Sequence, residues 1–215
     1  IIQKSLEKHK RKYGEQIPVK FHPYIRNTEA CFNSSKKAIE LAKANDTKLH
    51  ILHLSTAKEL NLFKPHAFPK DKKITCEVCP HHLWFNNSDY RNYGARIKWN
   101  PAIKSKKDGK KLLKGLSNNI IDTIATDHAP HTIEDKQINM ASGNFNYFKS
   151  ASGAPSIQHS LLAMLELSKK NKISIPTIAR KMCHSPADIF QIDKRGYIKE
   201  NFYADLVLVD PNVSP

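Results

Sequence analysis

The sequence predicts an α/β fold built on a parallel sheet, and three observations predict it. Apolar runs of strand length occur at residues 48–54, 73–79 and 119–126, and segments with helical periodicity lie between them. Capping-box patterns begin the helices expected after Thr56 and Ser105. Each strand-like run ends at imidazole or acidic side chains, and α/β barrels carry such groups at the carboxyl ends of their strands. We therefore expect part of a (β/α)8 TIM-type barrel.

Residues 119–131 are the stretch around which the chain is organised. An apolar run ends abruptly in Asp127, His128 and His131, and Pro130 stiffens the turn between them. At the end of a buried barrel strand, one carboxylate and two imidazoles suit a metal site or a general base. A surface loop that carries the same groups is the alternative interpretation.

Histidines also mark the ends of the two earlier strands. His53 falls on the same strand face as Leu49 and Ile51 at period two, which fits either a core histidine or a ligand. His81 and His82 follow the next strand. Because adjacent side chains diverge, we expect at most one of this pair to face a given site.

Asn100 ends a short strand that the sequence predicts over residues 95–100. Its side-chain amide both donates and accepts hydrogen bonds, which suits a substrate carboxylate or a ring amide. A long segment, 132–154, is rich in Asn, Ser and Gly. A connection of that length is usually functional or disordered.

The remaining elements are predicted from hydrophobic periodicity and from residues that begin, end or break helices. Residues 18–26 are predicted to be extended, because residues before proline avoid the helical region. Residues 197–210 return to the alternation typical of β structure. Helices are predicted over 1–15, 27–44, 105–116 and 156–170, with two short helices in 176–192 broken at Ser185-Pro186.

Composition argues against two classes of partner. The chain has 215 residues and a net charge of +15. Its lysines are spread over segments such as 4–12 and 104–114 and lack the interleaved aromatic residues of a nucleic-acid platform. We therefore expect a solvated basic surface and no nucleic acid. No run approaches the roughly 20 apolar residues that span a bilayer, and no signal peptide is recognised, so no membrane partner is expected.

The four cysteines do not resemble a disulfide framework, and this favours a reducing, cytoplasmic location. Cys76 and Cys79 form a C-x-x-C pattern, but a zinc knuckle needs a second pair. In a strand, an offset of three places the two thiols on opposite faces. The chain begins with Ile1 rather than Met and stops soon after a strand-like run, so we expect both ends to be cut.

Four ordered motifs resemble those of dihydroorotases, which belong to the amidohydrolase superfamily of metal-dependent barrels. The motifs are His53-Leu-Ser-Thr56, Glu77-Val-Cys-Pro-His-His82, Asn100-Pro101 and Thr126-Asp-His-Ala-Pro-His131. The tail from Gly196 to Asp210 also resembles the family's return to a small β domain. The resemblance implies that residues 1–195 are the C-terminal part of the barrel, approximately its last three strands. Residues 196–215 would then begin the small β domain.

The resemblance also implies roles for the strand ends. His53 and Asp127 would bind metal in a binuclear Zn²⁺ site, and Asp127 would also be the catalytic base. Substrate contacts are implied for Asn100, His131, Ser152 and Gly153. The reaction would be the reversible hydrolysis of dihydroorotate to N-carbamoyl-L-aspartate in pyrimidine (UMP) synthesis. The implied partners are this small-molecule substrate and either a second copy in a homodimer or aspartate carbamoyltransferase.

The chain departs from the family pattern in places. The family's H-x-H, bridging carboxylate and fifth-strand histidine would precede Ile1. His53 and Asp127 alone are too few to hold two metal ions, so we expect the isolated 215 residues to be inactive. The usual Asn-Pro-Pro-Leu-Arg is Asn100-Pro-Ala-Ile-Lys104, and the usual Phe-Gly is Ser152-Gly153.

Three alternatives stay open on the sequence alone. One is another cyclic-amide hydrolase, such as an allantoinase or a dihydropyrimidinase. The second is a non-catalytic dihydroorotase-like subunit that supports aspartate carbamoyltransferase. A basic nucleic-acid-binding module is the third and is the least supported by the charge pattern.

Overall fold

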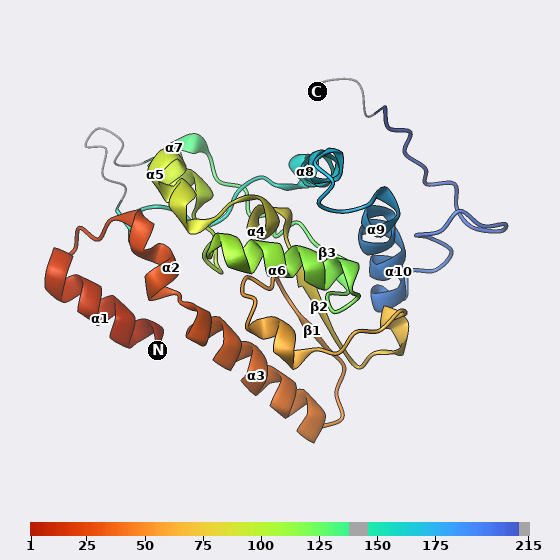
Figure 1. Ribbon diagram of the computed structural model, residues 1–215, viewed down its shortest axis with the longest axis horizontal. Coiled ribbons are helices and arrows are strands. Elements are labelled where there is room, and N and C mark those ends of the chain that lie inside the picture. Colours follow the sequence, from red (N-terminus) through yellow and green to blue (C-terminus); the bar gives the residue numbers. More distant parts are fainter. Residues whose placement is uncertain (138–145, 211–215) are drawn as a thin grey trace.

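The structure is a computed structural model, and it describes residues 1–137 and 146–210. Three short strands lie in the middle of the molecule, with helices around them (Figure 1). The strands are β1 (Leu49–Ile51), β2 (Ile74–Val78) and β3 (Thr123–Ile124). The longer helices are α1 (Ile2–Tyr13), α3 (Thr28–Ala44), α6 (Lys106–Ser117) and α8 (Ile157–Lys169). The shorter helices are α2 (His22–Ile25), α4 (Pro80–Trp84), α5 (Tyr90–Tyr93), α7 (Ile133–Gln137), α9 (Ile175–Ala179) and α10 (Ser185–Phe190).

The sheet is parallel, in the order β1-β2-β3, which confirms the predicted α/β class. Leu49 is in register with Ile74, and Glu77 is in register with Thr123. Among the described residues β1 and β3 each pair on one side only. The central strand β2, with five residues, is the longest of the three. All three carboxyl ends lie at one edge, so the groups that follow the strands converge there.

One face of the sheet carries the main hydrophobic core. Cys76, Val78 and Ile124 from the strands pack there with Leu112 and Leu116 of α6. Burying each Leu or Ile side chain stabilises the fold by about 1.5–3 kcal/mol. Helices α3 and α8 also contribute, through residues that include Ile39, Met164 and Leu167. This core fixes the orientation of the strands and therefore the position of their ends.

Local signals placed several helices correctly. Asn27 caps α3 by accepting a hydrogen bond from the N–H of Ala30, and Gly14 closes α1 with a positive φ of 59°. Ser105 and Asp108 form the predicted capping box at the start of α6. At Thr56 the predicted hydrogen bonds with Glu59 form, but the element that follows is a 3₁₀ helix over Glu59–Leu62.

The predictions for two further segments were wrong. Residues 18–26 are not extended, because they form a 3₁₀ turn over Val19–Phe21 and then α2, in which Pro23 occupies the first turn. A proline there removes no helical hydrogen bond, since the first N–H groups of a helix have no internal acceptor. The strand predicted over 95–100 is replaced by a 3₁₀ helix over Gly94–Ile97.

The segment from Ile175 to Phe190 is helical throughout, so Ser185-Pro186 does not break it. A π-helical turn over Arg180–His184 joins α9 to α10, and Pro186 lies in the first turn of α10. Widened turns of this kind relieve the steric and hydrogen-bonding conflict that a proline creates in a helix.

Residues 197–210 form no strand in this structure. Most apolar side chains of this tail are exposed, and Leu208 is fully so. A strand must exchange backbone hydrogen bonds with a neighbouring strand. Within the described residues, the bonds of this tail are turn contacts, such as that from the Tyr203 N–H to the carbonyl oxygen of Lys194, and no strand lies beside it. Figure 1 shows the tail running away from the helices towards the C-terminus. The division into 1–195 and 196–215 stays a prediction, and 211–215 lie outside the described residues. The long segment 132–154 is described only in part, because 138–145 lie outside as well.

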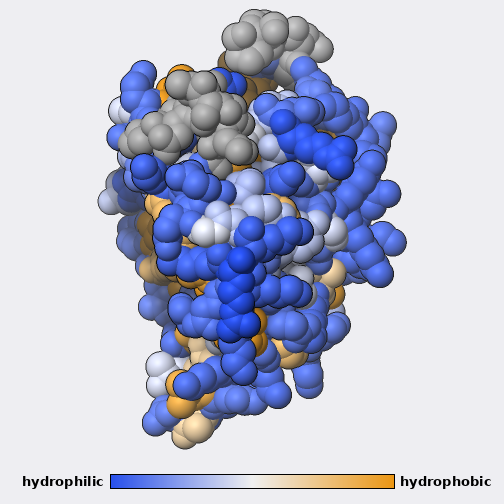
Figure 2. Space-filling model, turned by 90° about the vertical axis from the view of Figure 1, so that its left-hand side faces the viewer, coloured by the Kyte–Doolittle hydropathy of each residue, from blue (hydrophilic) through white to orange (hydrophobic). Residues whose placement is uncertain are grey.

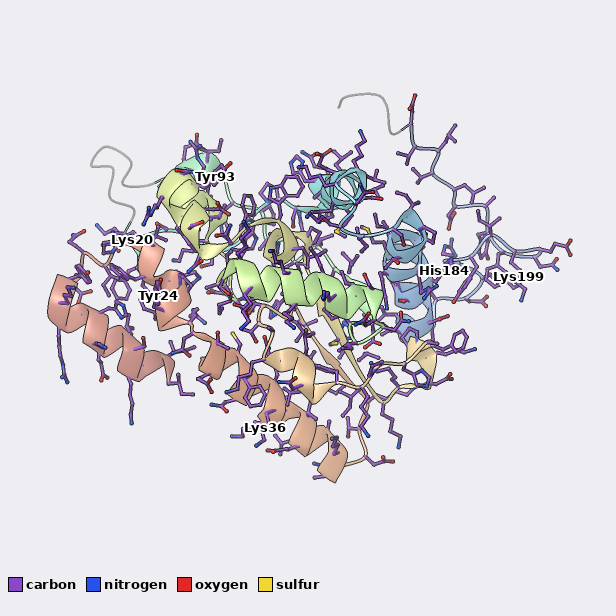
Figure 3. The ribbon with its side chains drawn as sticks, in the orientation of Figure 1. Lys20, Tyr24, Lys36, Tyr93, His184 and Lys199 are labelled. Atoms are coloured by element: carbon purple, nitrogen blue, oxygen red, sulfur yellow. The ribbon has the colours of Figure 1, made fainter. Side chains whose placement is uncertain are left out.

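The basic surface is dispersed. Helix α1 buries none of its residues, and the side of the molecule that carries it is largely hydrophilic (Figure 2). Lys20, Lys36 and Lys199 lie far apart in Figure 3 and come from three different segments. Among the described residues, no helix combines the length and the apolar character that a membrane crossing requires.

Candidate active site at the carboxyl ends of the strands

His53 and Asp127 lie just beyond β1 and β3, and both have left-handed backbones, with φ of 40° and 47°. Such values are uncommon for residues other than glycine, and they persist only where the surroundings impose them. The turn at His53 also ends the alternation of the strand. Leu49 and Ile51 pack against the hydrophobic core, and Ile51 and His53 both line a cavity. The two predicted metal ligands are therefore brought to the same edge of the sheet.

The carboxyl group of Asp127 is partly buried. Loss of hydration raises its pKa, the nearby His53 lowers it, and the negative charge of Glu77 raises it again. The net direction is upward, which makes the carboxylate a better proton acceptor than an exposed aspartate. Because the His53 side chain acts on the pKa of Asp127, the two side chains lie near each other.

His81, the first residue of the predicted histidine pair, faces this site. Its Nε2 lies 3.9 Å from Oδ2 of Asp127 and is buried without a hydrogen-bond partner among the described residues. The ring stacks on Trp99, with centroids 4.3 Å apart and planes 3° from parallel. His82 points elsewhere, since its Nε2 contacts the carbonyl oxygen of Pro101 at 3.1 Å. The expectation that at most one of the two faces the site agrees with this geometry.

Burial keeps the His81 ring neutral. Desolvation, assisted by the charges of His53 and Lys136, lowers the pKa of His81 to about 3. A neutral imidazole with an unsatisfied ring nitrogen is in the form that binds metal ions. The sequence interpretation had assigned no role to this residue. The signal that was available is its position directly after a strand in Cys-Pro-His-His.

The donor set fits Zn²⁺. Imidazole nitrogen from His53 and carboxylate oxygen from Asp127 are ligand types that zinc takes in catalytic sites. The unpartnered Nε2 of His81 adds a buried donor next to Asp127. Cys79, His81 and His82 also place one ligand-type atom each within 4.8 Å of one another, all buried.

A cavity of about 390 Å³ opens beside His53. Asn100 lines it, so the predicted metal ligand and the predicted substrate amide share one space. Arg26 and Glu59 also line the cavity. Lys104 is different, because its buried ammonium group donates to the carbonyl oxygen of Ala102 at 2.8 Å. Lys104 itself does not line this cavity.

Gly153 packs directly against the loop that carries Asp127. Its N–H donates to the carbonyl oxygen of Lys98 at 2.9 Å, and its own carbonyl oxygen accepts from Lys136 Nζ. A β-carbon at Gly153 would lie 2.5 Å from that of Ala129. Both backbone groups of Gly153 are thus used within the protein. Among the described residues, the backbone of Ser152 makes no such bond and is the part left for a ligand.

The two other histidines of the 119–131 stretch differ. His128 is structural in this geometry, because its Nδ1 accepts hydrogen bonds from the N–H groups of Ser156 and Ile157 at 3.1 and 3.3 Å. His131 is partly exposed, and within the described residues its side chain makes no hydrogen bond. His131 is therefore available to a ligand, whereas one of the two ring nitrogens of His128 is already engaged.

The fold and this site define a class, and comparison with known proteins agrees with it. The sequence matches the amidohydrolase family over residues 11–215, so the chain belongs to that family. It is 37% identical to the dihydroorotase of Carboxydothermus hydrogenoformans over 176 residues, which cover 82% of this chain and 39% of the relative. It is also 37% identical to the dihydroorotase of Ehrlichia canis, over 76% of this chain and 34% of the relative. The resemblance to dihydroorotases is thereby confirmed, and the chain spans about two fifths of the length of these relatives or less.

Solved structures of lower identity share the fold. The L-hydantoinase (dihydropyrimidinase) from Arthrobacter aurescens superposes with a TM-score of 0.81 at 23% identity, over 95% of this chain and 44% of that one. The dihydropyrimidinase from Brevibacillus agri NCHU1002 gives a TM-score of 0.80 at 20% identity, with the same coverage. At this identity the similarity establishes the fold alone.

Proposed function

We propose that the full-length protein is a dihydroorotase that interconverts dihydroorotate and N-carbamoyl-L-aspartate in pyrimidine synthesis. In this proposal, the chain forms approximately the last three strands of a (β/α)8 barrel and the start of a small β domain. The observation that carries the proposal is the convergence of His53 and Asp127 at one edge of the sheet, beyond β1 and β3 on either side of β2, both in left-handed turns. Relatives named dihydroorotase support the choice of substrate.

His53 and Asp127 are the proposed metal ligands, in a site for two zinc ions that is completed by residues of the full-length protein. When bound, zinc lowers the pKa of water and polarises the amide carbonyl of the substrate. Asp127 is the proposed general base, and its raised pKa suits it to hold a proton at Oδ2 during amide hydrolysis. The neutral ring of His81 lies beside this carboxylate, with Nε2 3.9 Å from Oδ2.

The substrate is proposed to lie in the cavity beside His53. There the amide of Asn100 can bind its carboxylate or its ring amide, because it offers both a donor and an acceptor. His131 is the second proposed contact, and the free backbone of Ser152, next to Gly153, is the third. A cytoplasmic location, with a homodimer or aspartate carbamoyltransferase as partner, is part of the same proposal.

A second candidate is a hydrolase of other cyclic amides. It is favoured by the solved structures that share the fold, which are named hydantoinase and dihydropyrimidinase. The test is turnover by the purified full-length protein of dihydroorotate, dihydrouracil, hydantoin and allantoin under one set of conditions. A preference of at least about tenfold in kcat/KM for dihydroorotate is expected. Preference for a ring without a carboxylate would refute the dihydroorotase proposal.

A non-catalytic dihydroorotase-like subunit is the remaining alternative. The same assay separates it, since such a subunit would turn over none of the four compounds while still binding aspartate carbamoyltransferase in a sizing or pull-down experiment. Retention of both His53 and Asp127 in one site favours the catalytic proposal.

A further inference from the structure

Glu77 is a buried carboxylate on the central strand β2, with 7% of the residue exposed. Its side chain accepts hydrogen bonds in two directions. Oε2 lies 2.9 Å from Nε2 of His50, and Oε1 accepts from the backbone N–H of His53 at 3.3 Å. Because an ionised carboxylate only accepts, Nε2 of His50 carries the proton in this contact. Glu77 therefore links two points of the neighbouring β1 segment.

The His50 side of this link is itself fixed. Nδ1 of His50 lies 2.7 Å from Oγ1 of Thr75, and the edge of the His50 ring meets Phe190, with ring centroids 5.7 Å apart. Thr75 and Glu77 lie two residues apart on β2, on the same face of the strand. The ring of His50 thus bridges them, and the Glu77 carboxylate has one defined position.

The other side of the link is the left-handed turn at His53. With φ of 40°, the backbone leaves the strand here, and the His53 N–H no longer takes part in the β1–β2 ladder. Glu77 satisfies this N–H through its side chain. It also accepts from the next N–H, that of Leu54, through its main-chain oxygen at 2.8 Å. One residue on the central strand therefore fixes two consecutive backbone groups of the turn.

We infer that Glu77 is a positioning residue that sets the orientation of the His53 imidazole through the backbone of the His53 turn. The inference rests on the proposed role of His53 as a metal ligand. A carboxylate suits this task because it satisfies two donors at once, whereas an amide in its place satisfies one and presents its own N–H to the other. Removal of a residue that orients a metal ligand without touching the metal usually lowers metal affinity by about 10- to 100-fold.

A merely structural His50–Glu77 pair is the competing explanation, and a matched control separates the two. Asp122 is also a buried carboxylate that ties the sheet together, because it accepts from Lys72 Nζ at 2.7 Å and from the N–H of Cys76 at 2.9 Å. Asp122 is 1% exposed and directly precedes β3, so it lies at the amino end of that strand and away from the carboxyl ends that carry His53 and Asp127. Removal of its charge perturbs packing without touching His53.

The experiment compares Glu77→Gln and Asp122→Asn in the full-length protein purified with zinc. The readouts are Zn²⁺ affinity by competition with a chromophoric chelator, kcat and KM for dihydroorotate, and melting temperature. For Glu77→Gln we expect zinc affinity to fall at least about tenfold and kcat to fall with little change in KM. Asp122→Asn should lower the melting temperature while zinc affinity stays within about twofold of wild type.

Wild-type zinc affinity in Glu77→Gln would overturn the inference, as would an equal loss of zinc in Asp122→Asn. If Glu77→Gln does not fold, His50→Gln replaces it, because it removes the second anchor of the carboxylate and keeps a polar side chain. The zinc affinity of His50→Gln should then fall several-fold, and an unchanged value would reject the inference. A wild-type protein that binds zinc but does not hydrolyse dihydroorotate refutes the proposed function alone, since the zinc comparison still decides the role of Glu77.

Discussion

Nε2 of His81 lies 3.9 Å from Oδ2 of Asp127, so the segments that follow β2 and β3 meet at one carboxylate. This contact follows from the sheet order, because β2 and β3 are neighbours and their carboxyl ends lie side by side. The ring of His81 is held on the other side by Trp99. Asp127 thus has the His81 ring on one side and the imidazole of His53 nearby.

Asp127→Asn should abolish turnover of dihydroorotate by the full-length protein while sparing the fold. General-base catalysis alone contributes about 10²- to 10⁴-fold, and a metal ligand is weakened as well. Among the described residues, the Asp127 carboxylate accepts no hydrogen bond, so little packing is lost. Steady-state kinetics and the circular dichroism melt of the same preparation check both parts. Glu134→Gln, at an exposed carboxylate on α7, is the control and should behave as wild type. Activity that survives in Asp127→Asn would show that the base is assigned wrongly.

Acid should destabilise the protein below about pH 6.5. Burial lowers the pKa of His22 and His81 to about 3 and that of His82 well below its usual value. The unfolded chain takes up protons at these residues below pH 6.5, whereas the folded chain does not. Stability is therefore complete above pH 6.5 and is lost as pH falls towards the folded values. Each histidine contributes about 1.4 kcal/mol per pH unit, so the three together give about 4 kcal/mol per pH unit.

Urea unfolding followed by tryptophan fluorescence at pH 7.5, 6.0 and 5.0 measures this slope. The exposed His66 provides the control, and His66→Asn should leave the slope unchanged. A free energy of unfolding that is flat between pH 7.5 and pH 5.0 would contradict the burial of the three neutral rings.

The sequence predicted those parts of the site that depend on one strand at a time. His53 and Asp127 stand at the ends of apolar runs, and the position of such residues follows from the strand itself. Glu77 was missed, because its partner His50 lies 27 residues earlier in the chain and meets it only across the β1–β2 register. His81 was left unassigned for a similar reason. The direction of its side chain depends on the helix that begins at Pro80.

Fold prediction succeeded where local signals and packing agree. Ser105 and Asp108 cap α6 as expected, and its apolar face packs in the hydrophobic core. It failed at 197–210, where alternation alone does not supply a strand partner, and at 18–26, where a proline begins a helix instead of preventing one. In both cases the outcome depends on hydrogen-bond partners that a local pattern does not contain.

Gly153→Ala should destabilise the protein and disturb the loop that carries Asp127. Gly153 has a φ of 122°, and an added β-carbon would lie 2.8 Å from the carbonyl oxygen of Ala129 as well as against its side chain. We expect a loss of about 2–4 kcal/mol from strain and overlap together, and a lower kcat. Gly14→Ala is the matched control, because its φ is also positive but nothing lies within 4 Å of the added atom. It should cost about 1 kcal/mol. Equal losses of unfolding free energy in the two variants would show that Ala129 moves aside without cost and that the overlap does not matter.

Lys98→Met should loosen the segment that presents Ser152 and Gly153. The ammonium group of Lys98 is buried and donates to the carbonyl oxygens of Tyr147 and Ser150 at 2.6 and 2.5 Å. Methionine keeps most of the volume but leaves both acceptors without a donor, which costs about 1–3 kcal/mol. Hydrogen exchange at residues 147–153 should accelerate at least about fivefold, and KM for dihydroorotate should rise. Lys149→Met, at an exposed position in the same segment, should change neither. Unchanged exchange in Lys98→Met would show that the segment is held by its other contacts, above all that between Lys136 and Gly153.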